Sequence, residues 1–332
     1  MDVDETANNT PMRVEELWFA DSGFVVQAGQ SLFRVSGAVL AARSSVFKDM
    51  LAFTQPPDAE TIDDCPVVKL LDSAEDVTCF FRAIFDSSFF EPYPSKVTFD
   101  NALSIARLSH KYSVDYLLRR ALVHLSYDFP TTLSSFDADT TYSTNMIDML
   151  DDNVYIPPYI ALVQLARQVN ALWMLPMAFY RLASANKEVI RQVWDCQMFS
   201  HHTARLGDDD RLVFVTCSAL FAGLETKAMR FLHPTDESAT CKGGDKCNAA
   251  RLSAIAEAQD SIAKAEGPDP LYICFSSLIW DALSKRCCTH CYKCLKSAHE
   301  QARQLIWDEL PTICGLPPWA DLEKMKVEAV KV

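Results

Sequence analysis

Hydrophobic and polar positions in the first 130 residues follow two different periods. Residues 24–28 and 31–35 are two short runs rich in β-branched and aromatic side chains, and the Gly29-Gln30 pair between them predicts a β-hairpin. From 39 to 51 the apolar residues recur at helical spacing, which predicts two short helices with Ser44-Ser45 as the cap between them. A further strand is predicted at 67–71.

Three longer helices are predicted after this strand. Ser73 begins a segment with the spacing of a capping box, and the apolar residues from Val77 to Phe85 recur at i, i+3, i+4, i+7 and i+8. The same period occupies 100–111 and then 114–125. Short strands interleaved with helices predict one α+β domain at 17–129, preceded by a flexible acidic tail at 1–16.

The second half of the chain carries only helical patterns. Residues 130–156 are rich in Thr, Ser and Asp without a sustained period, and they are predicted to form a linker. From Pro157 onward every long segment has helical spacing, which predicts an all-helical domain at 157–320 and a tail at 321–332. The expected fold class is therefore α+β, with an α/β N-terminal domain and a helical C-terminal domain.

Several separated segments of the N-terminal half resemble the BTB/POZ family. They are Phe33-Arg34-Val35-Ser36, the run Val39-Leu40-Ala41-Ala42-Arg43-Ser44, and the helix pair at 106–117, which reads ARLSHKYSVDYL. The resemblance covers about residues 18–129, and its pieces stand in the family's order. Beyond that domain, segments 175–180 and 310–319 are similar to BTB-containing proteins of mushroom-forming fungi.

The resemblance implies a small α/β unit that associates through an apolar surface with a second copy or with another protein. The alternative is that these apolar side chains pack only within their own domain, as helical apolar stripes commonly do. The residues expected near the interaction surface are Leu17, Trp18, Phe19, Phe47, Met50 and Leu51.

Departures from the family pattern narrow the partners that the resemblance implies. Gly23 and Ser36 stand where the family has an acidic residue and a histidine, so a charged peptide-recruiting pocket is not expected. Members that bind cullin scaffolds use a hydrophobic-x-Glu turn, and the corresponding segment 50–55 contains no glutamate. A cullin-type ubiquitin-ligase substrate adaptor is therefore kept only as an alternative.

Charge and composition argue against several other classes of protein. The chain has 31 Lys and Arg against 44 Asp and Glu, a net charge of −13, which is unfavourable for binding nucleic acid. Its 9 glycines form no phosphate-binding loop and no nucleophile elbow. The acidic N-terminus lacks a signal-peptide pattern, and the longest apolar stretch, 212–224, is shorter than the ~20 residues of a membrane span. A cytoplasmic or nuclear protein without a membrane partner is expected.

Cysteine spacing indicates a metal site in the second half. Of the 12 cysteines, eight follow residue 240, where Cys241 and Cys247 flank a Gly-Gly loop and Cys288 and Cys291 form a C-x₂-C pair. Two such pairs can supply four thiolates in a tetrahedron, which predicts a structural Zn²⁺. The alternative is a group of reduced, partly buried thiols. Spare ligand candidates are Cys287, His290 and Cys294.

No catalytic set can be assembled from the sequence. His299-Glu300 begins like the H-E-x-x-H motif, but Arg303 replaces its second histidine, so this helix face is expected to be solvated. His201-His202 is expected on the surface. The leading hypothesis is a non-enzymatic protein–protein interaction module with a helical partner-binding domain. A thiol- or metal-dependent enzyme is the alternative from a different class.

Overall fold

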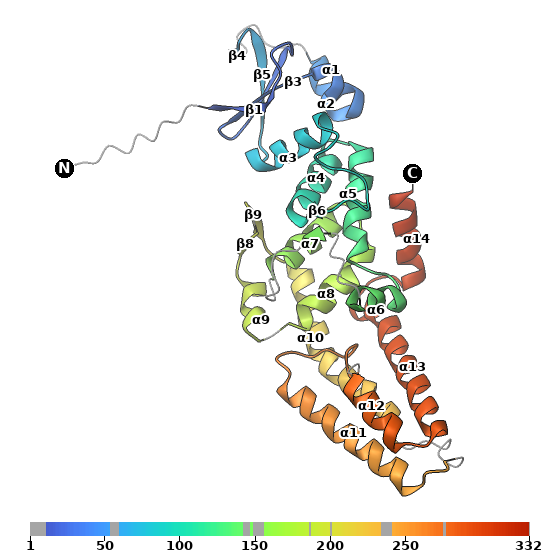
Figure 1. Cartoon of the computed structure of the whole chain (residues 1–332). Coiled ribbons are helices and arrows are strands. Elements are labelled where there is room, and N and C mark those ends of the chain that lie inside the picture. The colour runs from blue at the N-terminus through green and yellow to red at the C-terminus, as the bar shows by residue number, and fades with distance from the viewer. Residues whose placement is uncertain are drawn as a thin grey trace, which may run out of the picture.

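The chain folds into an elongated α+β structure with a small sheet at one end and long helices at the other (Figure 1). Helices α11 (Asp245–Lys264), α12 (Ser277–Arg286) and α13 (Thr289–Ile313) form the end that is distant from the sheet. We call them the distal helices. This computed structural model describes residues 11–53, 60–141, 147–148, 156–185, 187–199, 201–233, 241–274 and 277–331.

A five-stranded sheet forms the N-terminal end. Strands β2 (Phe24–Ala28) and β3 (Ser31–Val35) pair antiparallel across their full length, which confirms the predicted hairpin. Gly29 has φ +53° at the turn, a left-handed conformation that glycine adopts without steric cost. The other strands, which complete the order β1-β3-β2-β5-β4, are β1 (Met12–Trp18), β4 (Thr61–Ile62) and β5 (Cys65–Leu70).

Serine side chains cap three of the helices beside the sheet, and two of these caps were predicted. The Phe47 backbone N–H donates to Ser44 Oγ at 3.0 Å, and that of Asp76 donates to Ser73 Oγ at 3.1 Å. These bonds satisfy donors that the first helical turn leaves free, and both predicted caps are confirmed. The helices of this end are α1 (Gly37–Arg43), α2 (Ser45–Ala52), α3 (Ala74–Phe85), α4 (Phe99–Lys111) and α5 (Asp115–Tyr127).

Aromatic side chains fill the space between the sheet and these helices. Phe47 stacks on Tyr112 with ring centroids 4.7 Å apart, and Phe33 meets Phe81 edge-on at 5.5 Å. Phe80 also stacks on Tyr112. All five side chains are buried. Burial of large rings in such pairs stabilises this end through packing alone.

Parts of the two predicted tails, 1–16 and 321–332, form a strand and a helix. Strand β1 begins at Met12, inside the segment 1–16 that was predicted to be flexible, and pairs in parallel with β3. It is an edge strand with mostly exposed side chains, so its hydrophobic pattern is too weak to identify it. Helix α14 (Trp319–Val330) occupies most of the predicted tail at 321–332, buries Leu322 and packs against α5.

The predicted linker at 130–156 also contains a helix. Helix α6 (Leu133–Thr141) buries Leu133 and Phe136. A two-residue strand, β7 (Ile147–Asp148), pairs with β6 (Val97–Thr98). Residues 142–146 and 149–155 of the predicted linker lie outside the described residues.

The second half is mainly helical, but it is not all-helical. A short hairpin of β8 (Gln197–Phe199) and β9 (His202–Ala204) interrupts the helices. Strands of three residues are too short to show an alternating pattern, which is why the sequence did not predict them. Before the distal helices come α7 (Pro157–Gln168), η1 (Leu172–Met174), α8 (Leu175–Ala183), α9 (Lys187–Trp194), α10 (Asp208–Ala228) and η2 (Met229–Leu232).

One continuous hydrophobic core links the two halves. Trp173 of η1 is buried and donates its indole N–H to Ser126 of α5 at 2.9 Å. Within the described part of the chain, Asp208–Leu232 is the one helical stretch long and apolar enough to cross a membrane by length and composition. The same stretch buries Phe214 and Phe221, and α10 packs against α8 and α13.

Candidate metal centre

Four cysteines meet where two of the distal helices begin. Cys247 lies in the first turn of α11, and Cys241 lies just before that helix. Cys288 is the N-cap of α13, and Cys291 lies in its first turn. The N-terminus of a helix carries partial positive charge and free backbone N–H groups, which favour thiolates at this position.

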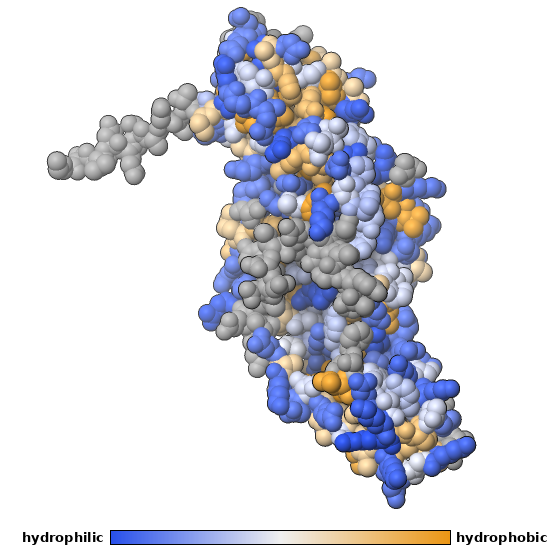
Figure 2. Space-filling model, in the orientation of Figure 1, coloured by the Kyte–Doolittle hydropathy of each residue, from blue (hydrophilic) through white to orange (hydrophobic). Residues whose placement is uncertain are grey.

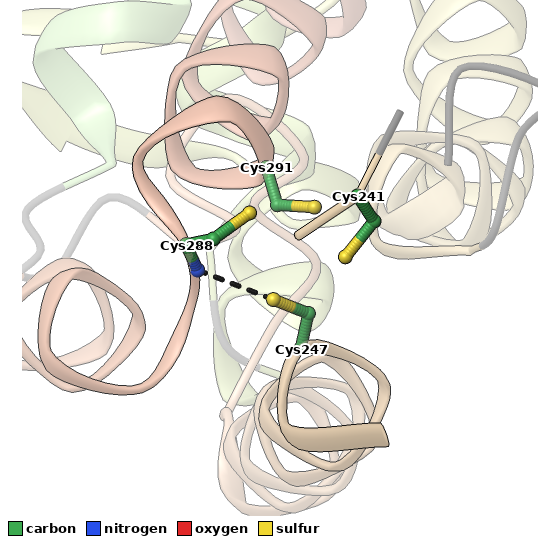
Figure 3. A group of neighbouring side chains, drawn as sticks. All are labelled: Cys241, Cys247, Cys288 and Cys291. Atoms are coloured by element: carbon green, nitrogen blue, oxygen red, sulfur yellow. Dashed lines mark hydrogen bonds between the residues drawn. The ribbon is translucent and has the colours of Figure 1, made fainter. Parts of the chain in front are cut away.

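The four sulfur atoms converge on one point (Figure 3). All four Sγ atoms lie within 4.8 Å of one another. A tetrahedral site with metal–sulfur distances of about 2.3 Å has sulfur atoms about 3.8 Å apart, so small side-chain rotations would complete the shell. The cluster, which we call the cysteine centre, can therefore hold a metal ion, and the predicted grouping of these cysteines is confirmed.

The loop between the first two cysteines is shaped by glycine. A Cβ atom on Gly243 would lie 2.3 Å from Cys247 Sγ, so only glycine leaves that sulfur in place. Gly244 has φ +50°, in the region that L-residues rarely adopt. Backbone N–H groups point at the sulfurs, from Gly243 to Cys241 Sγ at 3.4 Å and from Cys288 to Cys247 Sγ at 3.2 Å.

Two of the four thiols have a lowered pKa, and the other two have a raised pKa. Hydrogen bonds from the backbone N–H groups of Cys291 and Lys242 lower the pKa of Cys288 to about 6. The Cys291 side chain and the Gly243 N–H lower the pKa of Cys241. Burial raises the pKa of Cys247 and of Cys291. A bound cation would stabilise all four groups as thiolates, because a coordinating thiol is deprotonated.

The three spare ligand candidates lie outside the cysteine centre. His290 Nε2 and Cys294 Sγ are 3.6 Å apart, one turn from each other on α13. Cys287 is half-buried, and burial raises its pKa to about 11. None of these three belongs to a ligand group found among the described residues, in contrast to the four cysteines.

The predicted interaction residues divide between core and surface. Leu17 is 2% exposed and Phe47 is fully buried, so neither can contact a partner, and that part of the prediction is wrong. The Phe47 ring points into the core, where it stacks on the ring of Tyr112. The side chains of Trp18, Met50 and Leu51 are half-buried, and Phe19 is exposed.

Phe19 and Leu51 line a solvent-open hollow at the N-terminal end. Its volume is about 800 Å³, and Val39 and Phe85 contribute to its apolar wall. Figure 2 shows apolar residues gathered at the sheet end of the molecule, around α1 and α2. We call the hollow lined by Phe19, Val39, Leu51 and Phe85 the apolar hollow.

Two predictions about histidines are wrong. His299 is buried and its Nε2 lies 2.9 Å from the Ile273 carbonyl oxygen, so its helix face is not solvated. Arg303 on the same face is buried and binds the Asp137 carboxylate through two nitrogens, at 2.6 and 2.9 Å. His201 and His202 are half-buried and contact Asp76, which lies 125 and 126 positions away in the chain. No local signal in the sequence could have indicated that contact.

Comparison of the chain with protein-family models, with curated proteins and with solved structures finds no match.

Proposed function

We propose that this chain is a non-enzymatic protein–protein interaction protein that associates with a second copy of itself through its N-terminal end. In this proposal a structural Zn²⁺ in the cysteine centre holds the distal helices, which present a surface for another protein. The apolar hollow is the observation that carries the proposal, because Phe19 and Val39 are exposed to solvent there beside other apolar side chains.

The side chains around the hollow support association. Phe19 is exposed, but its ring is fixed against Phe85 with centroids 5.6 Å apart, so little side-chain entropy is lost when a partner covers it. Val39 and Phe53 are also exposed near α1 and α2. A stable pair buries about 800 Å² on each side, so the contact would extend beyond the hollow over α1 and α2. A second copy offers the same surface by symmetry. The BTB/POZ resemblance of residues 18–129 favours the same use of this end.

The cysteine centre supports a structural role for zinc. Four protein thiolates complete a tetrahedral shell and leave no position for substrate, unlike a catalytic zinc site with three protein ligands. The short-spaced pairs come from the starts of two helices, so one ion would join α11 to α13. Such an ion contributes free energy of folding and no chemistry.

Light scattering on the full chain at tens of micromolar tests the association. We expect the mass of two chains for the wild type and of one chain for the double variant Phe19→Glu/Val39→Glu, because two carboxylates cannot be desolvated in an apolar contact. The matched control is Leu252→Glu, at a side chain that is 67% exposed on α11 and should leave the pair intact.

A wild-type chain that stays monomeric, or a control that dissociates as readily as the double variant, would overturn the proposed self-association. The zinc content of each variant, measured by elemental analysis, separately tests the proposed structural ion.

A further inference from the structure

A second group of potential metal ligands joins the two halves of the molecule. His201 and His202 lie at the tip of the β8–β9 hairpin, and Asp76 lies in the first turn of α3. His201 Nε2 is 3.1 Å and His202 Nε2 is 2.9 Å from the same atom, Asp76 Oδ1. Figure 1 shows this hairpin reaching from the second half towards α3 and α4.

Hydrogen bonding alone does not satisfy this cluster. Arg107 Nη1 donates to Asp76 Oδ2 at 3.1 Å and also contacts His202 Nε2. A guanidinium only donates and a carboxylate only accepts. His202 Nε2 lies against both a donor, Arg107, and an acceptor, Asp76 Oδ1. If Nε2 carries a proton, that proton is repelled by the Arg107 N–H. If Nε2 carries a lone pair, the lone pair is repelled by the Asp76 carboxylate. A cation between the two imidazoles and Oδ1 would remove the conflict with the carboxylate, because all three atoms would direct lone pairs at it. Arg107 would then donate to Asp76 Oδ2 alone.

We propose that Asp76 Oδ1, His201 Nε2 and His202 Nε2 bind a divalent transition-metal ion, with Zn²⁺ as a fitting member of that class. Imidazole and carboxylate ligands suit these ions. Ligand distances of about 2.1 Å in a tetrahedron place ligand atoms about 3.4 Å apart, a few tenths of an ångström more than the two distances observed. The ion acts as a clasp between α3 and the hairpin.

The burial of Asp76 and its contact with Arg107 both favour a metal ion at this site. Asp76 is buried, so its carboxylate gains more from a cation than an exposed carboxylate does. Arg107 holds the opposite oxygen, Oδ2, and so orients Oδ1 towards the imidazoles, as outer-shell partners of metal ligands do. The site shares no residue with the cysteine centre and does not depend on it.

Metal counting on the full chain tests the proposal. After dialysis against Zn²⁺ or Co²⁺ and removal of unbound ion, we expect two ions per wild-type chain. The double variant His201→Ala/His202→Ala should retain one ion, and so should Cys288→Ser/Cys291→Ser. Asp76→Asn keeps a hydrogen-bond acceptor beside the hairpin but removes the anionic ligand, and it should also retain one ion. His110→Ala, at an exposed histidine of α4, is the matched control and should retain two.

Cobalt absorption separates the two sites. Thiolate ligands give an intense near-ultraviolet charge-transfer band, whereas nitrogen and oxygen ligands give only weak visible bands. The histidine variant should keep the intense band, and the cysteine variant should keep only the weak ones. An ion that survives in the cysteine variant supports the clasp even if the zinc proposed for the cysteine centre fails. If the cysteine variant binds no ion, or if the histidine and Asp76→Asn variants bind as many ions as the wild type, the clasp is refuted.

Discussion

The sheet end and α11, the first of the distal helices, bury different kinds of side chain. At the sheet end, Phe33, Phe47 and Phe81 are fully buried and lie in ring-to-ring contact. Along α11, the buried residues are mostly small, with Ala250, Ala254 and Ala258 facing the neighbouring helices. An alanine removes far less apolar area from water than a phenylalanine does, so burial along α11 contributes much less stability per residue.

This difference in buried apolar area indicates where a bound metal ion would add most to stability. A helix that packs through alanine gains little free energy from burial, so a cross-link to a neighbouring helix adds stability that its own packing does not. The cysteine centre lies at the alanine-rich end, where Cys247 and Cys291 are buried. The metal ion that we propose between the starts of α11 and α13 would supply free energy that packing along α11 does not.

Removal of one zinc ligand should have the largest effect, and it should be confined to the distal helices. Structural zinc contributes about 10–16 kcal/mol in small zinc domains, so we expect Cys247→Ala to lose the ion and to expose α11 and α12 to amide exchange. Hydrogen exchange should show the sheet end still protected. Cys294→Ala, outside the cysteine centre, is the control. Equal loss of protection at both ends would contradict the contrast between the two regions.

Phe47→Ala should produce the opposite pattern. Truncation of a fully buried phenylalanine costs about 3–5 kcal/mol, so denaturant unfolding of the sheet end should shift by that amount while the zinc content stays the same. Phe53→Ala, at a side chain that is 75% exposed, should change stability little. Loss of zinc from the cysteine centre in Phe47→Ala would show that the two ends are not stabilised independently.

Gly243→Ala should have the smallest effect, restricted to metal affinity. The new Cβ would lie 2.3 Å from Cys247 Sγ, so the sulfur must rotate away from its position in the cysteine centre. We expect zinc affinity to fall about 10- to 100-fold, or about 1.4–2.8 kcal/mol, as for other changes next to metal ligands. Competition with a chromophoric chelator measures it. Gly223→Ala, which meets no atom within 4 Å, should leave zinc affinity unchanged, and a similar loss there would argue against the steric explanation.

Elements with strong local signals were predicted well. The β2–β3 hairpin and the helices that begin after Ser44 and Ser73 depend on spacing and capping within a few residues, and all three are confirmed. Strand β1 and helix α14 were missed. An edge strand has little buried surface of its own, and the chain's last helix packs on α5, whose position no local pattern indicates.

The candidate sites likewise divide into features with a local sequence signal and features that depend on long-range packing. Residue types and pair spacings were sufficient to select the four cysteines of the cysteine centre, because each pair is local and two pairs can make a complete shell. Burial of Leu17 on β1 and of Phe47 on α2 was not predictable from their apolar character, since an apolar face that packs inward and one that meets a partner have the same sequence pattern.

The amino-acid sequence by itself determined most of the helices, the β2–β3 hairpin and the two cysteine pairs, because hydrophobic period, capping and ligand spacing act over a few residues. Only the tertiary structure decided that the two pairs meet, that the apolar hollow stays open, and that His201 and His202 reach Asp76. Those contacts join segments that are far apart in the chain, and their geometry depends on how all the intervening elements pack.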